Sequence, residues 1–177
     1  MTTATRPEIA FRRVTPDDLP LLRGWLARPH VAQWWGEAED ELKLVADYIG
    51  SPRLDCHLIL LDGQPVGYIQ CYPTGVWPGD HFADQPPGSR GIDLYLGETS
   101  AMGNGSRVLR AYLERLAAAG VRQVLIDPDP ANVRAVRAYE KAGFRAFRRV
   151  EAGELGPALL MRWEPDRPRL PTAPAPS

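Results

Sequence analysis

The spacing of apolar side chains along the chain predicts strands and helices in alternation. Short alternating runs, and short apolar runs bounded by turn residues, are typical of strands. Such runs lie at residues 8–14, 57–61, 66–72, 91–97, 121–126, 144–150 and 158–163. Between the second and third runs, Asp62-Gly63 is a strong signal for a hairpin turn. The pattern therefore predicts a hairpin within a larger sheet.

Apolar positions at helical spacing predict helices between these strands. Thr15 and the following Pro-Asp-Asp form a capping segment for a helix over 19–26, and an acidic first turn favours a second helix over 37–49. A third helix over 106–119 has a buried stripe of Val108, Leu109, Tyr112, Leu113 and Leu116, and Gly120 ends it. Strands and helices in this order indicate the α/β (α+β) class.

The chain is long enough for one domain, and no Gly/Ser linker divides it. We expect an N-terminal extension over 1–8, a domain over 9–163 and a flexible proline-rich tail over 164–177. The 18 residues from Pro73 to Arg90 are rich in proline and glycine, and long loops of this kind often cover a ligand site.

The stretch from Ile126 to Phe144 is the most informative piece of the sequence. An apolar run over 123–126 is stopped by Pro128 and Pro130, and Asn132 or Asp129 can cap the helix that follows. Its apolar positions recur at helical spacing, while its basic residues fall largely on the other side. Gly143 supplies the left-handed residue that ends the helix.

This stretch resembles the GNAT N-acetyltransferase superfamily. Asn132 followed by Ala138-Tyr-Glu-Lys-Ala-Gly-Phe144 matches the Asn…Tyr-x-Lys-x-Gly-Phe segment of that family. The resemblance extends over residues 9 to 163 and implies the GNAT fold, with a mixed, mostly antiparallel central sheet flanked by helices, and acetyl-CoA as co-substrate. Within the superfamily, four blocks occur in the order found in aminoglycoside 6'-N-acetyltransferases: Pro29-His-Val-Ala-Gln-Trp-Trp-Gly36, Gly67-Tyr-Ile-Gln70, Arg90-Gly-Ile-Asp93 and Ile126-Asp-Pro128.

The resemblance implies a set of residues that bind acetyl-CoA: Leu94, Tyr95, Leu96, Met102, Gly103, Asn104, Gly105, Ser106, Arg107, Asn132, Ala135, Tyr139 and Lys141. The bend over 101–107 sits at a helix N-terminus, whose free N–H groups suit a pyrophosphate. Its sequence departs from the family pattern, because Ala101 or Met102 replaces a basic or amide residue and Arg107 replaces a small one. Arg107 either faces solvent or supplies charge to a phosphate. Asn132 either contacts the pantetheine or serves only as the N-cap.

Transfer of an acetyl group to an amine requires a group that accepts the amine's proton. Asp93 has this role in the resembling enzymes, and its alternative is an ion pair with Arg90. Tyr139 matches the family's acid, which protonates the leaving sulfur; its alternative is to pack the helix onto the sheet. Asp127 matches a second acidic contact to a polycation, while Asp129 is assigned mainly to capping.

Further acceptor contacts are expected from Trp34, Trp35, Gln70, Tyr72, Trp77, Asp80 and Asp84. One of the two adjacent tryptophans can pack in the core while the other forms a wall for a sugar ring. The acidic residues Glu37, Glu39, Asp40 and Glu41 either attract a cation or only favour a helix start. His30 and His81 lack ligand spacing and are assigned to polar surface or loop positions.

Composition excludes several other classes of protein. A formal net charge of -1 gives no reason to expect a nucleic-acid or anionic membrane partner, and no apolar run approaches the length of a membrane span. With no signal-peptide core, the cytoplasm is the expected compartment. Cys56 and Cys71, without Cys/His ligand spacing, argue against a metal site. A hairpin that pairs Leu61 with Val66 places these cysteines opposite each other, as reduced thiols.

The first hypothesis is thus an acetyl-CoA-dependent aminoglycoside 6'-N-acetyltransferase. The acceptor is an aminoglycoside or another small polyamine, and the chain is a monomer or a homodimer. One alternative is a siderophore-type lysine or polyamine N-acyltransferase, which the N-terminal arm resembles. Asp93 argues against it, because those enzymes typically place a histidine near this strand start. Another is a non-catalytic CoA-binding module, suggested by the irregular loop over 102–107.

Overall fold

The computed structural model describes residues 5–151 and 156–166. Its strands are β1 (Ile9–Arg13), β2 (Asp55–Leu61), β3 (Gln64–Pro73), β4 (Arg90–Leu96), β5 (Val124–Ile126), β6 (Arg145–Val150) and β7 (Ala158–Trp163). They form one sheet in the order β1-β2-β3-β4-β5-β7-β6, in which only the β4–β5 pair is parallel. The predicted fold class, a mixed and mostly antiparallel sheet with flanking helices, is confirmed. Of the predicted extension and tail, residues 1–4 and 167–177 lie outside the described part.

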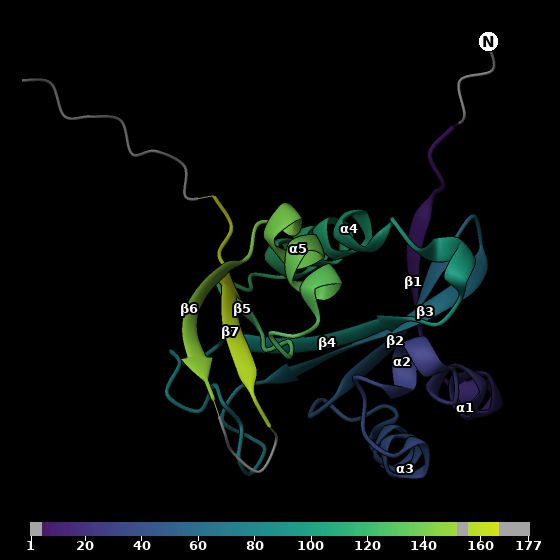
Figure 1. Ribbon diagram of the computed structural model, residues 1–177, viewed down its shortest axis with the longest axis horizontal. Helices are drawn as coiled ribbons and strands as arrows, with labels where there is room; N and C mark the ends of the chain where they lie inside the picture. Colours follow the sequence, from purple (N-terminus) through teal and green to yellow (C-terminus); the bar gives the residue numbers. More distant parts are fainter. Residues whose placement is uncertain (1–4, 152–155, 167–177) are drawn as a thin grey trace, which may run out of the picture.

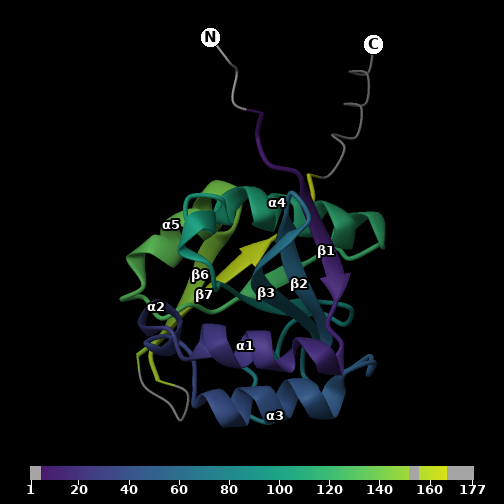
Figure 2. The ribbon, with the colours of Figure 1, turned by 90° about the vertical axis from the view of Figure 1, so that its right-hand side faces the viewer.

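Helices cover both faces of the sheet. The α-helices are α1 (Leu19–Leu26), α2 (Pro29–Ala32), α3 (Ala38–Tyr48), α4 (Gly105–Ala118) and α5 (Val133–Ala142), with short 3-10 turns at Pro16–Asp18 and Thr99–Ala101. Figure 1 shows α4 and α5 on one face and α1, α2 and α3 on the other. In Figure 2, α1 and α3 run side by side beneath the sheet. The sequence pattern did not separate α2 from the helical arm before it.

Each face of the sheet has its own apolar core. On the α4/α5 side, the stripe predicted for α4 is buried, with Val108, Leu109, Tyr112 and Leu113 at 1% exposure or less. On the other side, Leu22 and Trp25 of α1 and Leu42 of α3 pack against Tyr68 and Tyr95 of the sheet. Burying each large apolar side chain contributes about 1.5–3 kcal/mol of stabilising free energy, which holds the helices to the strands.

The register of the β2–β3 hairpin differs from the prediction. Asp62 and Gly63 both have positive φ, which gives a two-residue turn that pairs Leu61 with Gln64. A bulge between Ile59 and Leu60 then shifts the register by one. The predicted pairing of Cys56 with Cys71 is therefore wrong: their partners are Gln70 and Asp55. Because one residue of shift reverses the face, the two buried, free cysteines belong to different cores.

Strands β4 and β5 separate after a short stretch of pairing. Their register contains only Arg90 with Val124 and Gly91 with Leu125. From Ile92 onward, β4 has no neighbouring strand on that side among the described residues, so this edge of the strand faces an opening in the sheet. Asp93 on β4 and Asp127 after β5 follow the point of separation, and the opening therefore positions the site.

Helix α5 borders this opening and has the two ends that its sequence predicts. The side chain of Asn132 accepts a hydrogen bond from the backbone N–H of Ala135 at 3.2 Å, as an N-cap. At the other end Gly143 has φ 107°, a conformation that a glycine adopts without strain. The capping hypothesis for Asn132 is confirmed, and only its Oδ1 is used by the cap.

Candidate active site

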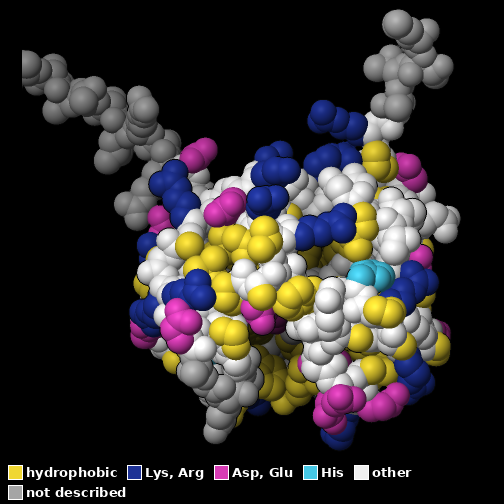
Figure 3. All heavy atoms as spheres, in the orientation of Figure 1, with side chains coloured by type: hydrophobic (Ala, Val, Ile, Leu, Met, Phe, Trp, Pro, Cys, Tyr) yellow, Lys and Arg dark blue, Asp and Glu magenta, His cyan; other side chains and the backbone are white. Residues whose placement is uncertain are grey.

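Two cavities meet at the opening between β4 and β5. One, of about 460 Å³, lies toward α3 and the loop over 74–89; the other, of about 640 Å³, lies toward α2, α4 and α5. Five residues line both: Trp34, Trp35, Leu94, Asn132 and Tyr139. Figure 3 shows the hollowed face, with Lys and Arg side chains along the upper rim where α4 and α5 lie. A molecule in one cavity can therefore touch a molecule in the other.

The two cavities carry opposite charge. The first is lined by the carboxylates of Glu41, Asp80, Asp93, Asp127 and Asp129, and by no Lys or Arg of the described chain; we call it the acidic cavity. The second is lined by Arg134, Arg137 and Lys141, and by no described Asp or Glu; we call it the basic cavity. Opposite charges at one junction favour two ligands of opposite charge.

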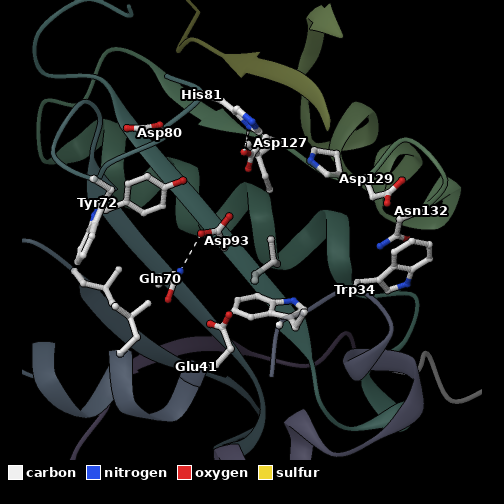
Figure 4. A pocket seen from close by; sticks show the side chains of 18 of the residues that line it. Trp34, Glu41, Gln70, Tyr72, Asp80, His81, Asp93, Asp127, Asp129 and Asn132 are labelled. Atoms are coloured by element: carbon white, nitrogen blue, oxygen red, sulfur yellow. Dashed lines mark hydrogen bonds and ion pairs between the residues drawn. The ribbon is translucent and has the colours of Figure 1, made fainter. Parts of the chain in front are cut away.

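Asp93 lies at the base of the acidic cavity, as Figure 4 shows. It is opposite Gln70 in the β3–β4 register, and Gln70 Nε2 donates to its Oδ2 at 2.9 Å. Burial raises the pKa of Asp93 to about 7, with Asp127 adding to the rise, while Gln70 lowers it. The alternative ion pair with Arg90 is not formed, because residues three apart on a strand point to opposite faces. A carboxylate with such a pKa can accept a proton near neutral pH.

Asp127 lies at the end of β5 and is bonded to a histidine from the long loop. His81 Nδ1 and Asp127 Oδ2 are 2.8 Å apart, with side chains 15% and 22% exposed. Burial raises the pKa of Asp127, and the bond from His81 lowers it. His81 occupies a loop, one of the two positions expected for it, but it also lines the acidic cavity and bonds to a carboxylate there, which the sequence did not indicate.

Aromatic side chains form the walls of the acidic cavity. Trp34 is 39% exposed at its mouth, whereas Trp35 packs edge-on to Tyr95 with ring centroids 4.8 Å apart. Trp34 is thus exposed at the mouth, while Trp35 packs against the core and also lines both cavities. Tyr72 lies opposite Gly91, and a Cβ on Gly91 would stand 2.3 Å from its ring. The glycine next to Ile92 and Asp93 is needed so that Tyr72 can lie over β4.

Tyr139 stands where the two cavities join. It lies on α5, is 9% exposed, and lines both cavities. Burial raises the pKa of its hydroxyl, and the charges of Asp93 and Asp127 raise it further. The phenol is therefore neutral at ordinary pH and can donate a proton or a hydrogen bond to a group at the junction.

Most of the predicted acetyl-CoA residues line the basic cavity: Leu94, Tyr95, Leu96, Met102, Gly103, Gly105, Ser106, Asn132, Ala135, Tyr139 and Lys141. Asn104 and Arg107 do not. Arg107 bonds to Asn104 Oδ1 at 3.0 Å and to the carbonyl of Pro7 at 3.1 Å, so it ties the helix start to the N-terminal segment. The expectation that Arg107 supplies charge to a phosphate is not met by this geometry.

Most of the acceptor contacts predicted from the sequence line the acidic cavity: Trp34, Trp35, Gln70, Tyr72, Asp80, Asp93 and Asp127. Trp77 lines it too, but Asp84 does not, because its carboxylate pairs with Arg148 at 2.7 Å. Glu39 likewise pairs with Arg23 outside the cavity.

Sequence reasoning missed two charged residues of the basic cavity, Arg134 and Arg137, and left open whether Glu41 attracts a cation or only favours a helix start. Glu41 falls with Ala38, Leu42 and Val45 on one face of α3, and a carboxylate on an apolar face was the available signal. Arg134, Arg137 and Lys141 share one face of α5, and this common face was the signal for a site that binds phosphate.

The described residues contain no group of three or more His, Cys, Asp and Glu side chains arranged to hold a metal ion. Within the same part of the chain, every helix is too short or too polar to cross a membrane.

Comparisons with known proteins relate the chain to acetyltransferases. Residues 15–152 match the family model described as an acetyltransferase (GNAT) domain. The aminoglycoside N(6')-acetyltransferase type 1 of Klebsiella pneumoniae is 34% identical over 171 residues, which cover 90% of this chain and 84% of that protein. A solved structure of AAC(6')-Ib with ribostamycin and coenzyme A has a TM-score of 0.80 at 32% identity, covering 89% of this chain and 94% of that one. Another, with paromomycin and acetyl-CoA, has a TM-score of 0.79 at 33% identity and the same coverage.

Proposed function

The chain belongs to the GNAT acetyltransferase family, and we propose that it transfers an acetyl group from acetyl-CoA to the 6'-amine of an aminoglycoside. The relative from Klebsiella pneumoniae is named for this reaction, and the related AAC(6')-Ib was solved with an aminoglycoside together with coenzyme A or acetyl-CoA. The transfer would turn a charged ammonium group of the drug into a neutral amide. Loss of that charge weakens binding to the RNA phosphate backbone, which explains resistance.

One observation carries this proposal: an acidic cavity and a basic cavity meet at Leu94 and Tyr139. An aminoglycoside is a polycation with sugar rings, and the acidic cavity offers five carboxylates and an exposed tryptophan. Acetyl-CoA carries phosphates, and the basic cavity offers three cationic side chains on α5. The reacting ends of both molecules would then lie at the junction.

The residues of the basic cavity fit acetyl-CoA in three respects. The N-terminal end of α4, reached through Gly103 at φ +92°, presents backbone N–H groups suited to a pyrophosphate. Arg134, Arg137 and Lys141 supply positive charge. The edge of β4 at Leu94 and Tyr95, which has no strand partner among the described residues, can bond to an extended amide chain as a neighbouring strand would, whereas the Leu96 carbonyl already lies 3.0 Å from His30 Nε2. Acetyl-CoA, when bound, supplies the acetyl group as a thioester.

Asp93 and Tyr139 divide the proton transfers between them. Ionised Asp93 accepts one proton from the acceptor ammonium, which frees the lone pair of the nitrogen for attack on the carbonyl carbon. A C–N bond forms and the C–S bond breaks. Neutral Tyr139 donates its proton to the departing sulfur, and the second proton lost by the nitrogen restores the phenol. The remaining carboxylates hold other ammonium groups of the acceptor.

Purified protein with acetyl-CoA and different acceptors tests this function. We expect release of CoA thiol with kanamycin and tobramycin, and NMR of the product should show acetylation at the 6'-nitrogen. The matched control is an aminoglycoside that carries a hydroxyl at the 6' position, which should give no turnover. Turnover with lysine or spermidine alone would show that the acceptor is a small amine and not an aminoglycoside. Binding of acetyl-CoA without thiol release from any amine would favour the non-catalytic module.

A further inference from the structure

A chain of buried hydrogen bonds leads away from Asp93 into the core. Gln70 Nε2 donates to Asp93 Oδ2 at 2.9 Å, and the hydroxyl of Tyr68 lies 2.8 Å from Gln70 Oε1 and 3.1 Å from the Sγ of Cys56. Cys56, Tyr68 and Gln70 are 6%, 1% and 6% exposed. Tyr68 does not line either cavity, so it touches no ligand.

The Tyr68 hydroxyl determines which end of the Gln70 amide faces Asp93. A carboxamide has an acceptor end and a donor end of nearly equal shape. The phenol has one proton, and the amide oxygen is a better acceptor than the sulfur of Cys56. When Tyr68 donates to Oε1, the N–H₂ end must point to Asp93. Bonds in such a chain polarise each other inside the protein, so the donation to the carboxylate is strengthened.

The other charged and titratable groups around Asp93 disfavour its ionised form or do not contact it. Asp127 at the end of β5, Glu41 on α3 and Asp80 on the long loop each raise the pKa of Asp93. Tyr139 on α5 is neutral, and His81 is bonded to Asp127 instead. Among the described side chains, Gln70 alone donates a hydrogen bond to this carboxylate. The orientation of the Gln70 amide therefore has a large influence on whether Asp93 is ionised.

We propose that Tyr68 is a positioning residue for the acetyl transfer: its hydroxyl fixes the Gln70 amide so that Asp93 is held ionised with Oδ1 free for the acceptor amine. The inference rests on the proposed function, in which Asp93 accepts the amine's proton. Tyr68 lies behind Gln70 and lines neither of the two cavities.

Substitution of Tyr68 by Phe should change the pH dependence of the reaction. Without the hydroxyl, Oε1 loses its donor, and the flipped amide would turn an oxygen lone pair toward Asp93. That arrangement is stable only when Asp93 is protonated, so the pKa of Asp93 should rise. Because the reaction needs the ionised form, the acid limb of kcat/KM should move to higher pH, by about 0.5 to 1 unit for one such hydrogen bond.

The experiment compares Tyr68→Phe with Tyr112→Phe. Tyr112 is as buried as Tyr68, at 1% exposure, but its hydroxyl lies 3.5 Å from His57 Nδ1 on the other side of the sheet. We measure kcat/KM for kanamycin between pH 5.5 and 9. The expected result for Tyr68→Phe is a loss of about 5-fold at pH 6, recovery at pH 9, and an unchanged KM for acetyl-CoA. Tyr112→Phe should keep the wild-type profile, and Gln70→Met should shift it at least as far as Tyr68→Phe.

Carbon-13 NMR titration of the Asp93 carboxyl gives a readout that needs no turnover, with Asp93→Asn used for assignment. The pKa of Asp93 should rise in Tyr68→Phe and stay unchanged in Tyr112→Phe. Equal carboxyl titrations in wild type and Tyr68→Phe would overturn the inference, as would a loss of activity that is the same at every pH. If the wild type acetylates no aminoglycoside, the proposed function fails, and the NMR titration still decides the role of Tyr68.

Discussion

The acidic and basic cavities are built in different ways. Carboxylates of the acidic cavity come from four separate parts of the chain: α3, the long loop, β4 and the end of β5. The cationic side chains of the basic cavity all come from α5, next to the start of α4. One cavity depends on how distant elements meet, and the other mainly on a helix pair that is local in sequence.

This difference explains why the carboxylates of the acidic cavity need hydrogen-bond partners inside the protein. Like charges gathered out of water raise each other's pKa, and here burial raises the pKa values of Glu41, Asp93 and Asp127. Gln70 and His81 each offset part of that effect by bonding to one carboxylate. The cationic side chains of the basic cavity stand on successive turns of one helix, where water and bound phosphates can screen them.

The largest expected effect follows from replacing Asp93 by Asn. The amide keeps the size of the side chain but cannot accept the amine's proton, so kcat/KM for kanamycin should fall about 10²- to 10⁴-fold. The rise of activity with pH near the pKa of about 7 should disappear with it. Because Asp93 does not line the basic cavity, calorimetric binding of acetyl-CoA should be unchanged. A variant that loses acetyl-CoA binding to the same extent would contradict the separation of the two cavities.

Substitution of Tyr139 by Phe tests the junction itself. A thiol is a fair leaving group without help, so loss of the phenol should lower kcat by about 10-fold, less than the usual range for a general acid. The KM values for both substrates should change less than kcat, because the ring remains. Single-turnover measurement isolates the chemical step. An unchanged kcat would mean that Tyr139 only packs α5 against the sheet, a role that also accounts for its burial.

Local features of the fold could be predicted from the sequence because the decisive contacts are local. The cap at Asn132, the left-handed Gly143 and the buried stripe of α4 each depend on residues within a few positions. The β2–β3 register was wrong by one residue because the turn is two residues shorter than the predicted pairing of Leu61 with Val66 requires, and a bulge that no turn signal marks restores only one of them. Such an error reverses the faces of Cys56 and Cys71.

Some site residues could be predicted from the sequence and others could not. Gln70, Asp93 and Asp127 could be placed in the acidic cavity because the family resemblance relates positions that are distant in sequence. His81 could not, because no residue near it in the sequence indicates that its loop returns to the end of β5. Arg107 was expected at the phosphates by its position at the start of α4, but its side chain turns toward Pro7, a contact 100 residues away in sequence.

A smaller effect is expected from replacing His81 by Ala. Without its bond to His81, Asp127 loses a contact that lowers its pKa and fixes its orientation, so a second ammonium of the acceptor should bind less well. We expect KM for kanamycin to rise about 5-fold, within the range of the net contribution of one ordinary hydrogen bond, and kcat to stay within about 2-fold. The matched control is Asp84→Asn, which alters the same loop outside the cavity. In a double-mutant cycle with Asp127→Asn, additive losses would show that the two residues act separately.

The smallest effect is expected from Arg107→Ala. This variant tests whether Arg107 contacts phosphate, as its position at the start of α4 suggests, or only the protein, as its hydrogen bonds indicate. Arg107 bonds to Asn104 and Pro7 and does not line the basic cavity, so KM for acetyl-CoA should change by less than about 2-fold, while the melting temperature falls by a few degrees. Arg137→Ala is the matched variant, because Arg137 lines the cavity. It should raise KM for acetyl-CoA by about 5-fold, as expected for one charge contact to phosphate from an exposed side chain, with less effect at high salt. If Arg107→Ala weakened acetyl-CoA more than Arg137→Ala does, the phosphates would be held at the start of α4, and the basic cavity on α5 would lose its assigned ligand.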